Sequence, residues 1–179
     1  MEKMKKISLG LAMVLGAFAL CAAEVKINGA FANVNPKTNI PAHWFLNSWS
    51  GYKPAPAIKV IKDGKVAALE FSNITSKHGF GFNCSNYFPC KKGQTVTVTA
   101  RVKGKGKAFF QLQTFGAKAW TGLLPSKTVD LTADWKEVKV TLPVDNVKGK
   151  DATVKAMFTL GGSKGIQSLS ISSIKLDLK

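Results

Sequence analysis

Apolar and polar residues alternate along several short stretches of the chain, and a period of two residues indicates β-strands. The clearest stretch is QTVTVTARV at 94–102, in which every second residue is valine or alanine. Similar alternation is found at 107–115, 135–142, 152–160 and 168–178. Strands with one apolar face and one polar face are typical of antiparallel sheets that pack against a single core.

Turn residues separate these stretches. Asp63-Gly64 lies between two apolar arms and predicts a β-hairpin. Gly104-Lys105-Gly106 predicts a second hairpin turn, between the stretches at 94–102 and 107–115. The region 33–56 is rich in asparagine, proline and aromatic residues, and we expect a long loop around a short strand near Trp44.

The whole pattern predicts an all-β fold. No segment combines a sustained 3.6-residue apolar period with a helix-capping sequence. Many short strands separated by turns indicate an antiparallel β-sandwich, and a jelly roll suits the length and the strand number. Without an internal repeat or a linker, we expect a single domain over 24–179.

Residues 1–23 have the three-part pattern of a secretory signal peptide. Three lysines precede an apolar run from Ile7 to Leu20, and small residues follow at 21–23. The run is about 14 residues, shorter than the roughly 20 that a membrane span needs. We therefore expect no membrane span, cleavage near Ala23, and a secreted or periplasmic protein. Lipidation of Cys21 is the alternative, although Leu20 before it is not small.

Basic residues greatly outnumber acidic ones, with 26 Lys+Arg against 10 Asp+Glu in 179 residues and a formal net charge of +16. Removal of residues 1–23 leaves 23 basic and 9 acidic residues, a net charge of +14. Export makes nucleic acid an unsuitable partner, and the charge then favours acidic glycans or other anionic polymers. Arg101 and the lysines at 103, 105 and 107 crowd one predicted hairpin, where they could attract a polyanion or protect a sheet edge.

Two cysteines, Cys84 and Cys90, remain after export, and an even number in an oxidising compartment predicts a disulfide. Six residues of extended strand cover about 20 Å, whereas bridged Cα atoms lie within about 7 Å. The bridge therefore requires a chain reversal inside CSNYFPC. The alternative is two buried thiols. Neither cysteine has a histidine at zinc-ligand spacing.

The sequence carries little that indicates catalysis. Its two histidines, His43 and His78, are far apart, and no pair of acidic residues is marked by its context. Sequence motifs of serine hydrolases, zinc proteases and phosphate-binding loops are absent. We expect a protein that is not an enzyme and that uses no cofactor, with a small glycosidase or lyase as the remaining catalytic alternative.

Aromatic and amide side chains instead suggest glycan recognition. A sugar ring has an apolar face that stacks on an aromatic ring and polar edges that bond to planar amides. Aromatic residues cluster in one predicted loop, a further tryptophan lies in a glycine-containing loop, and two glutamines share one strand face. The predicted ligand-binding residues are Trp44, Trp49, Tyr52, Gln111, Gln113 and Trp120. The alternative for each tryptophan is core packing.

Four fragments, in order, resemble carbohydrate-binding modules of the families four and nine type. They are VKINGAF near the start, CKKGQTVTVTARVKGKG, LTADWKEVKVTLPV and the terminal SLSISSIKLDL. The resemblance implies a galactose-binding-like β jelly roll that binds β-linked polysaccharide or oligosaccharide in a cleft or at loop tips. Such modules often accompany a catalytic domain, so a separate glycan-active enzyme is an expected partner.

This chain differs from the modules that it resembles in one chemical feature. Modules of this type often carry an acid after the first fragment and another in the last strand, near a structural calcium. This chain has Ala32 and Ser172-Ser173 at those places. Hard oxygen ligands are therefore missing where calcium would need them, and we expect no metal. A structural or protein-interaction domain without sugar binding is the alternative function.

Overall fold

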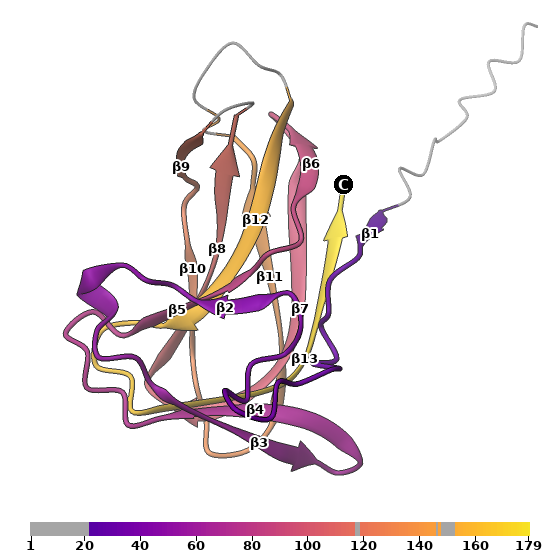
Figure 1. Cartoon of the computed structure of the whole chain (residues 1–179). Coiled ribbons are helices and arrows are strands. Elements are labelled where there is room, and N and C mark those ends of the chain that lie inside the picture. The colour runs from indigo at the N-terminus through magenta and orange to yellow at the C-terminus, as the bar shows by residue number, and fades with distance from the viewer. Residues whose placement is uncertain (1–21, 117–118, 146, 148–152) are drawn as a thin grey trace, which may run out of the picture.

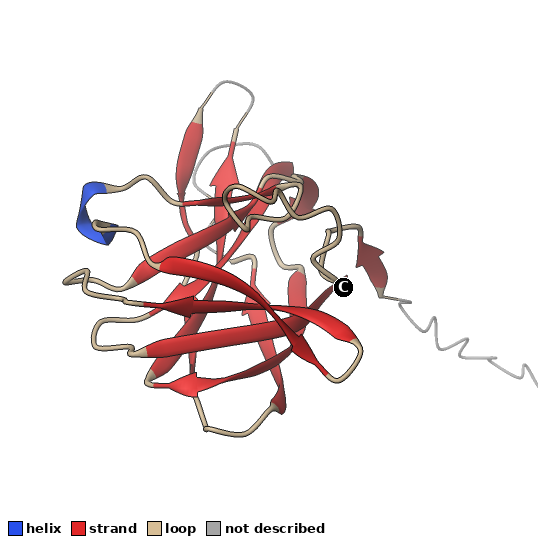
Figure 2. Ribbon diagram, turned by 60° about the horizontal axis from the view of Figure 1, so that its bottom comes forward, coloured by secondary structure: helices blue, strands red, loops and turns tan. Residues whose placement is uncertain are grey.

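A computed structural model of the chain describes residues 22–116, 119–145, 147 and 153–179. Most of the predicted signal peptide, residues 1–21, lies outside the described residues, and its removal stays a prediction. The described residues form two antiparallel β-sheets (Figure 1). Figure 2 shows strands throughout and one short helical turn, η1 (Ser50–Tyr52). No helix in this part of the chain is long and apolar enough to cross a membrane.

The first sheet has six strands, in the order β11-β7-β13-β4-β3, with β1 paired to β13. Its strands are β1 (Ala23–Val25), β3 (Ala57–Asp63), β4 (Val66–Ser72), β7 (Thr95–Lys105), β11 (Lys136–Pro143) and β13 (Ser168–Leu178). β3 and β4 form the hairpin predicted at Asp63-Gly64, and Gly64 has a φ of 60° that suits a tight turn.

The second sheet has seven strands, in the order β10-β8-β12-β5-β2, with β6 on β12 and β9 on β8. Its strands are β2 (Trp44–Leu46), β5 (Phe80–Cys84), β6 (Phe88–Lys91), β8 (Lys107–Phe115), β9 (Trp120–Leu123), β10 (Lys127–Asp130) and β12 (Thr153–Gly162). The predicted antiparallel β-sandwich with jelly-roll architecture is confirmed.

The core lies between the two sheets and follows the predicted alternation. Val96, Val98 and Val102 of β7 have no exposed surface and point inward. Phe110 and Leu112 of β8 face them from the second sheet and belong to the same core. The alternate residues of β8, which include Gln111 and Gln113, therefore lie on the outer face of the seven-stranded sheet.

The predicted hairpin at Gly104-Lys105-Gly106 is wrong. β7 pairs with β11 and β13, whereas β8 pairs with β12, β9 and β10, so the chain crosses from one sheet to the other at this point. A Cβ at Gly106 would lie 2.8 Å from the Cα of Ile166, so the crossing needs a residue without a side chain. Arg101, Lys103 and Lys105 therefore lie on β7, whereas Lys107 begins β8 in the other sheet.

The predicted disulfide is also absent, because Cys84 and Cys90 are both free and buried. The two residues lie on β5 and β6, which pair with different parts of β12. Asn83 pairs with Thr159 and Cys90 with Val154, which puts the two cysteines about four strand residues, or ~13 Å, apart along the sheet. A bridge needs Cα atoms within ~7 Å. Burial raises the pKa of Cys90 to about 11, so its thiol stays protonated.

Candidate functional site

A cavity of about 320 Å³ lies on the outer face of the seven-stranded sheet. Eight side chains from four segments line it: Asn47, Trp49, Tyr52, Gln111, Gln113, Trp120, Leu123 and Thr159. Five of the six ligand-binding residues predicted from the sequence are in this set. The fold brings together positions that are up to 112 residues apart in the chain, from Asn47 to Thr159.

The floor of the cavity consists of polar side chains on β8 and β12. Gln113 Nε2 donates to Thr159 Oγ1 at 2.9 Å, and Thr159 Oγ1 donates to Asn83 Oδ1 at 3.0 Å. Gln111 Nε2 donates to the carbonyl oxygen of Leu124 at 2.9 Å. These bonds fix both amides by their N–H groups. Within the described part of the chain, neither glutamine side-chain oxygen accepts a protein hydrogen bond, so both can accept from a ligand hydroxyl.

One wall comes from the loop around η1, where glycines allow aromatic rings to pack closely. The ring of Trp49 lies over Gly51, at which a Cβ would be 2.5 Å from the indole. Tyr52 lies over Gly81 of β5, where a Cβ would be 3.0 Å from the phenol ring. The rings of Trp49 and Tyr52 meet edge to face, with centroids 4.9 Å apart. Burial raises the pKa of Tyr52, so its hydroxyl remains a hydrogen-bond donor at neutral pH.

The other wall comes from β9, on the opposite side of the β8–β12 pair. Trp120 and Leu123 line the cavity, and Trp120 pairs in register with Phe115 of β8. Trp120 is 55% exposed and Trp49 is 52% exposed. Exposed apolar surface that gathers beside a hollow is typical of a ligand-binding site. Both rings are therefore available for stacking.

The sixth predicted residue, Trp44, is a correction, because it belongs to the core. It is 5% exposed, and its ring stacks on Phe82 with centroids 4.9 Å apart and an interplanar angle of 12°. Its Nε1 donates to the carbonyl oxygen of Asn28 at 2.9 Å. On the short strand β2 the side chains alternate, so Trp44 faces inward while Phe45 is 40% exposed. No free face of Trp44 remains for a sugar ring.

Sequence reasoning missed three residues of the cavity, which are Asn47, Leu123 and Thr159. Thr159 occupies a polar position between the core residues Phe158 and Leu160, and this alternation was a readable signal. The pairing of β12 with β8, which puts Thr159 opposite Gln111, has no local sequence signal. Asn47 and Leu123 have no feature that separates them from other loop and edge residues.

The described part of the lining is electrically neutral. Among the described residues that line the cavity, none is an aspartate, glutamate, histidine, lysine or arginine. Across the described residues, no group of three or more His, Cys, Asp or Glu side chains is arranged to hold a metal. The arrangement therefore offers stacking and hydrogen bonding, and the titratable side chain that it places beside a ligand is that of Tyr52, whose pKa is raised by burial.

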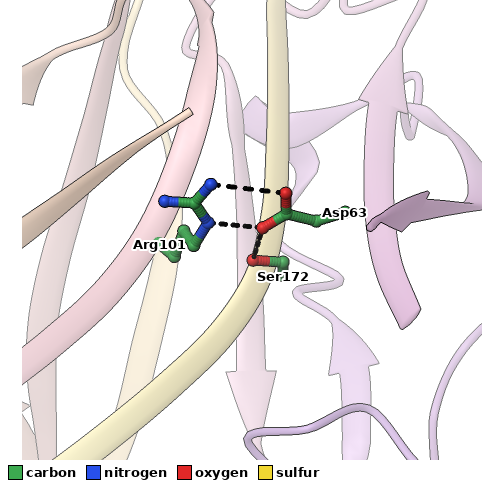
Figure 3. Close-up of polar contacts among 3 residues, drawn as sticks. All are labelled: Asp63, Arg101 and Ser172. Carbon is green, nitrogen blue, oxygen red and sulfur yellow. Dashed lines mark hydrogen bonds and ion pairs between the residues drawn. The ribbon is translucent and has the colours of Figure 1, made fainter. Parts of the chain in front are cut away.

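A second polar centre lies on the six-stranded sheet (Figure 3). Arg101 donates from Nε to Asp63 Oδ2, and Ser172 Oγ donates to the same oxygen at 2.9 Å. The hydrogen bond from Arg101 is the main reason why the pKa of Asp63 lies below its usual range. These groups satisfy one another and tie the end of the β3–β4 hairpin to β7 and β13. These contacts therefore stabilise the six-stranded sheet.

A larger hollow of about 820 Å³ runs along the loop at 33–44. Its lining comes from that one loop, and its only aromatic residues are His43 and the buried Trp44. It therefore lacks the exposed aromatic rings and the paired amides of the cavity on β8.

Comparison with known proteins gives similarity in structure but not in sequence. No family model and no curated protein matches the chain. A solved structure reported as "CBM4 structure and function" matches with a TM-score of 0.52 at 21% identity, over 85% of this chain and 98% of that one. The family 11 carbohydrate-binding module of a cellulosomal cellulase from Clostridium thermocellum matches with a TM-score of 0.56 at 12% identity, over 86% and 94%.

Non-module proteins share the fold as well. A Stig cyclase from Fischerella sp. TAU matches with a TM-score of 0.60 at 13% identity, over 88% of this chain and 98% of the cyclase. At these identities the likeness shows the fold alone. The chain thus has the fold of carbohydrate-binding modules, and this fold also supports enzymes.

Proposed function

We propose that this protein is a secreted or periplasmic, non-catalytic carbohydrate-binding module. Its cavity on the seven-stranded sheet would hold part of a polysaccharide or oligosaccharide chain. One observation carries the proposal: two half-exposed tryptophans, Trp49 and Trp120, flank a floor of oriented amides from Gln111 and Gln113. The module fold of the structural neighbours supports the same function.

The geometry suits the two kinds of surface that a sugar presents. Trp49 and Trp120 would stack against the C–H faces of sugar rings, and a buried aromatic contact is a major source of binding energy. The free oxygens of Gln111 and Gln113 would accept hydrogen bonds from hydroxyl groups. Because Thr159, Asn83 and the Leu124 carbonyl already hold the amides, little side-chain entropy would be lost on binding.

The net charge would act on binding only from outside the cavity. The sequence predicts a preference for acidic glycans, yet the described residues that line the cavity are neutral. Any contribution from lysines to binding inside this cavity would therefore be long-range. Raising the salt from about 0.01 M to about 0.1 M shortens the screening length from ~30 Å to ~10 Å and should reduce that contribution.

Calorimetric titration against neutral and acidic polysaccharides tests the proposal. The panel contains β-glucan, xylan, galactan and mannan beside alginate and polygalacturonate, each at the two salt concentrations. We expect saturable binding to at least one polymer and its loss in the Trp49→Ala/Trp120→Ala double variant. Binding to none, or unchanged affinity in the double variant, contradicts the proposal.

The same experiments distinguish the proposed glycan binding from two other functions, an enzyme and a domain for protein contacts. The cyclase neighbour, solved with an indole compound, favours an enzyme, although no carboxylate is among the described residues that line this cavity. Release of reducing ends from any polymer in the panel, or turnover of a small aromatic substrate, would support an enzyme. A surface domain for protein contacts would bind no glycan and would retain a partner through purification.

A further inference from the structure

A second pocket, of about 220 Å³, lies beside the cavity on the outer face of the seven-stranded sheet. Its lining consists of Tyr87, Phe115, Gly116, Ala119 and Lys155. None of these residues lies in the four fragments that resemble carbohydrate-binding modules. None is among the ligand-binding residues predicted from the sequence. Its position and the charge of Lys155 give the pocket a distinct chemistry.

The pocket continues the cavity along the same strands. Phe115 follows Gln113 by two residues on the same face of β8, a distance of about 7 Å. Trp120, which lines the cavity, pairs in register with Phe115, which lines the pocket. A linear oligosaccharide stacked on Trp120 of β9 can therefore extend over the neighbouring Phe115 of β8 into the pocket.

The pocket combines an aromatic corner with a cation. The rings of Tyr87 and Phe115 meet edge to face with centroids 5.0 Å apart, and Tyr87 is 50% exposed. Lys155 of β12 pairs in register with Phe115, so its side chain stands next to that corner. In contrast to Lys107 and Lys175, Lys155 forms no ion pair with the described residues.

From this arrangement we infer that the pocket is a subsite for a sugar with an anionic substituent, next to the neutral sugars of the main cavity. The sugar ring packs against Tyr87 and Phe115, and its carboxylate or sulfate accepts a charge-assisted hydrogen bond from Lys155 Nζ. The acidic preference expected from the overall charge is thus assigned to one lysine. The inference rests on the proposed glycan binding, since the main cavity must hold the rest of the chain.

The experiment compares three matched forms of each β-1,4-linked oligosaccharide of glucose, mannose and galactose. Each neutral oligosaccharide is paired with its uronate form, which differs by the carboxylate at C6, and with a C6-sulfated form. Wild type, Lys155→Gln and Lys139→Gln are titrated at about 0.01 M salt, where charges are weakly screened. Lys139, on the exposed face of β11 in the other sheet, is the control for the same loss of charge.

We expect an anionic form to bind wild type about fivefold more tightly than its neutral partner, the upper range for an exposed ion pair. Lys155→Gln should remove this difference between the anionic and neutral forms, whereas Lys139→Gln should keep it. The uronate and sulfate arms tell which anion the subsite accepts. Equal loss in both lysine variants would show an effect of net charge and overturn the subsite. Neutral binding without any anionic preference would also overturn the subsite while leaving the proposed function intact. Binding of no form would refute the proposed function itself.

Discussion

Replacing Trp120 by alanine should weaken glycan binding and leave the fold unchanged. The side chain is 55% exposed, and a tryptophan can bury up to ~250 Å², so about 140 Å² is available to a ligand. A sugar ring that covers half of this surface removes about 70 Å² from water. At about 25 cal/mol per Å², the lost contact amounts to about 1.5–2 kcal/mol, a 10- to 30-fold weaker Kd.

The assay for Trp120→Ala is calorimetric titration with whichever oligosaccharide of the panel binds wild type most tightly, together with urea denaturation of the same samples. Because the side chain lies outside the core, the free energy of unfolding should change by no more than about 0.5 kcal/mol. Trp120→Phe is the matched variant, since it keeps a smaller ring at the same place and should recover part of the affinity. A Trp120→Ala variant that binds as well as wild type would refute the assignment of this ring to the ligand.

Four further changes test other parts of the account. Trp44→Ala should lower the free energy of unfolding by about 3–5 kcal/mol in urea titrations, because a core ring and its bond to Asn28 are lost; a binding defect at full stability would contradict this. Gly81→Val should displace the tyrosine ring above it and weaken glycan binding severalfold in calorimetry, with an unchanged circular dichroism spectrum. The pKa of Asp63 is lowered on folding, so its contribution to stability is present above about pH 4 and is lost as the pH falls through the folded-state pKa. Thermal melts of Asp63→Asn should therefore depend less on pH below about pH 4 than those of wild type, and parallel curves would contradict the pairing. Cys84 and Cys90 should resist alkylation in the native protein and both react in denaturant without reductant, as counted by mass spectrometry, whereas two unreactive sulfurs would show a disulfide.

Local alternation made most of the strands predictable. The valines of β7 and the apolar positions of β8 are buried as the sequence indicates, because a period-two pattern has only one way to face a single core. The crossing at Gly104–Gly106 was not predictable in this way. A glycine-rich link suits both a hairpin and a change of sheet, and the choice depends on which strands pair, which is decided by distant residues.

At the site, the composition of the sequence predicted the type of chemistry but not the position of every residue. Tryptophans and glutamines identify a type of chemistry, and Trp49, Tyr52, Gln111, Gln113 and Trp120 do meet at one cavity. Composition cannot distinguish Trp44 from Trp49, which lie five residues apart. The difference arises because β2 turns Trp44 towards Phe82, whereas Trp49 precedes η1 and packs over Gly51. Similarly, the spacing of the cysteines allowed a bridge that the separate pairing of β5 and β6 with β12 prevents.

The central claim is that a glycan binds in the cavity on β8 and β12, and chemical-shift mapping tests it most directly. Isotope-labelled protein is titrated with the tightest-binding oligosaccharide, and the side-chain N–H signals of tryptophan and glutamine are followed. We predict the largest changes at the indoles of Trp49 and Trp120 and at the amides of Gln111 and Gln113, with little change at the core indole of Trp44. Changes confined to the loop at 33–44 or to the outer face of the six-stranded sheet would contradict the account.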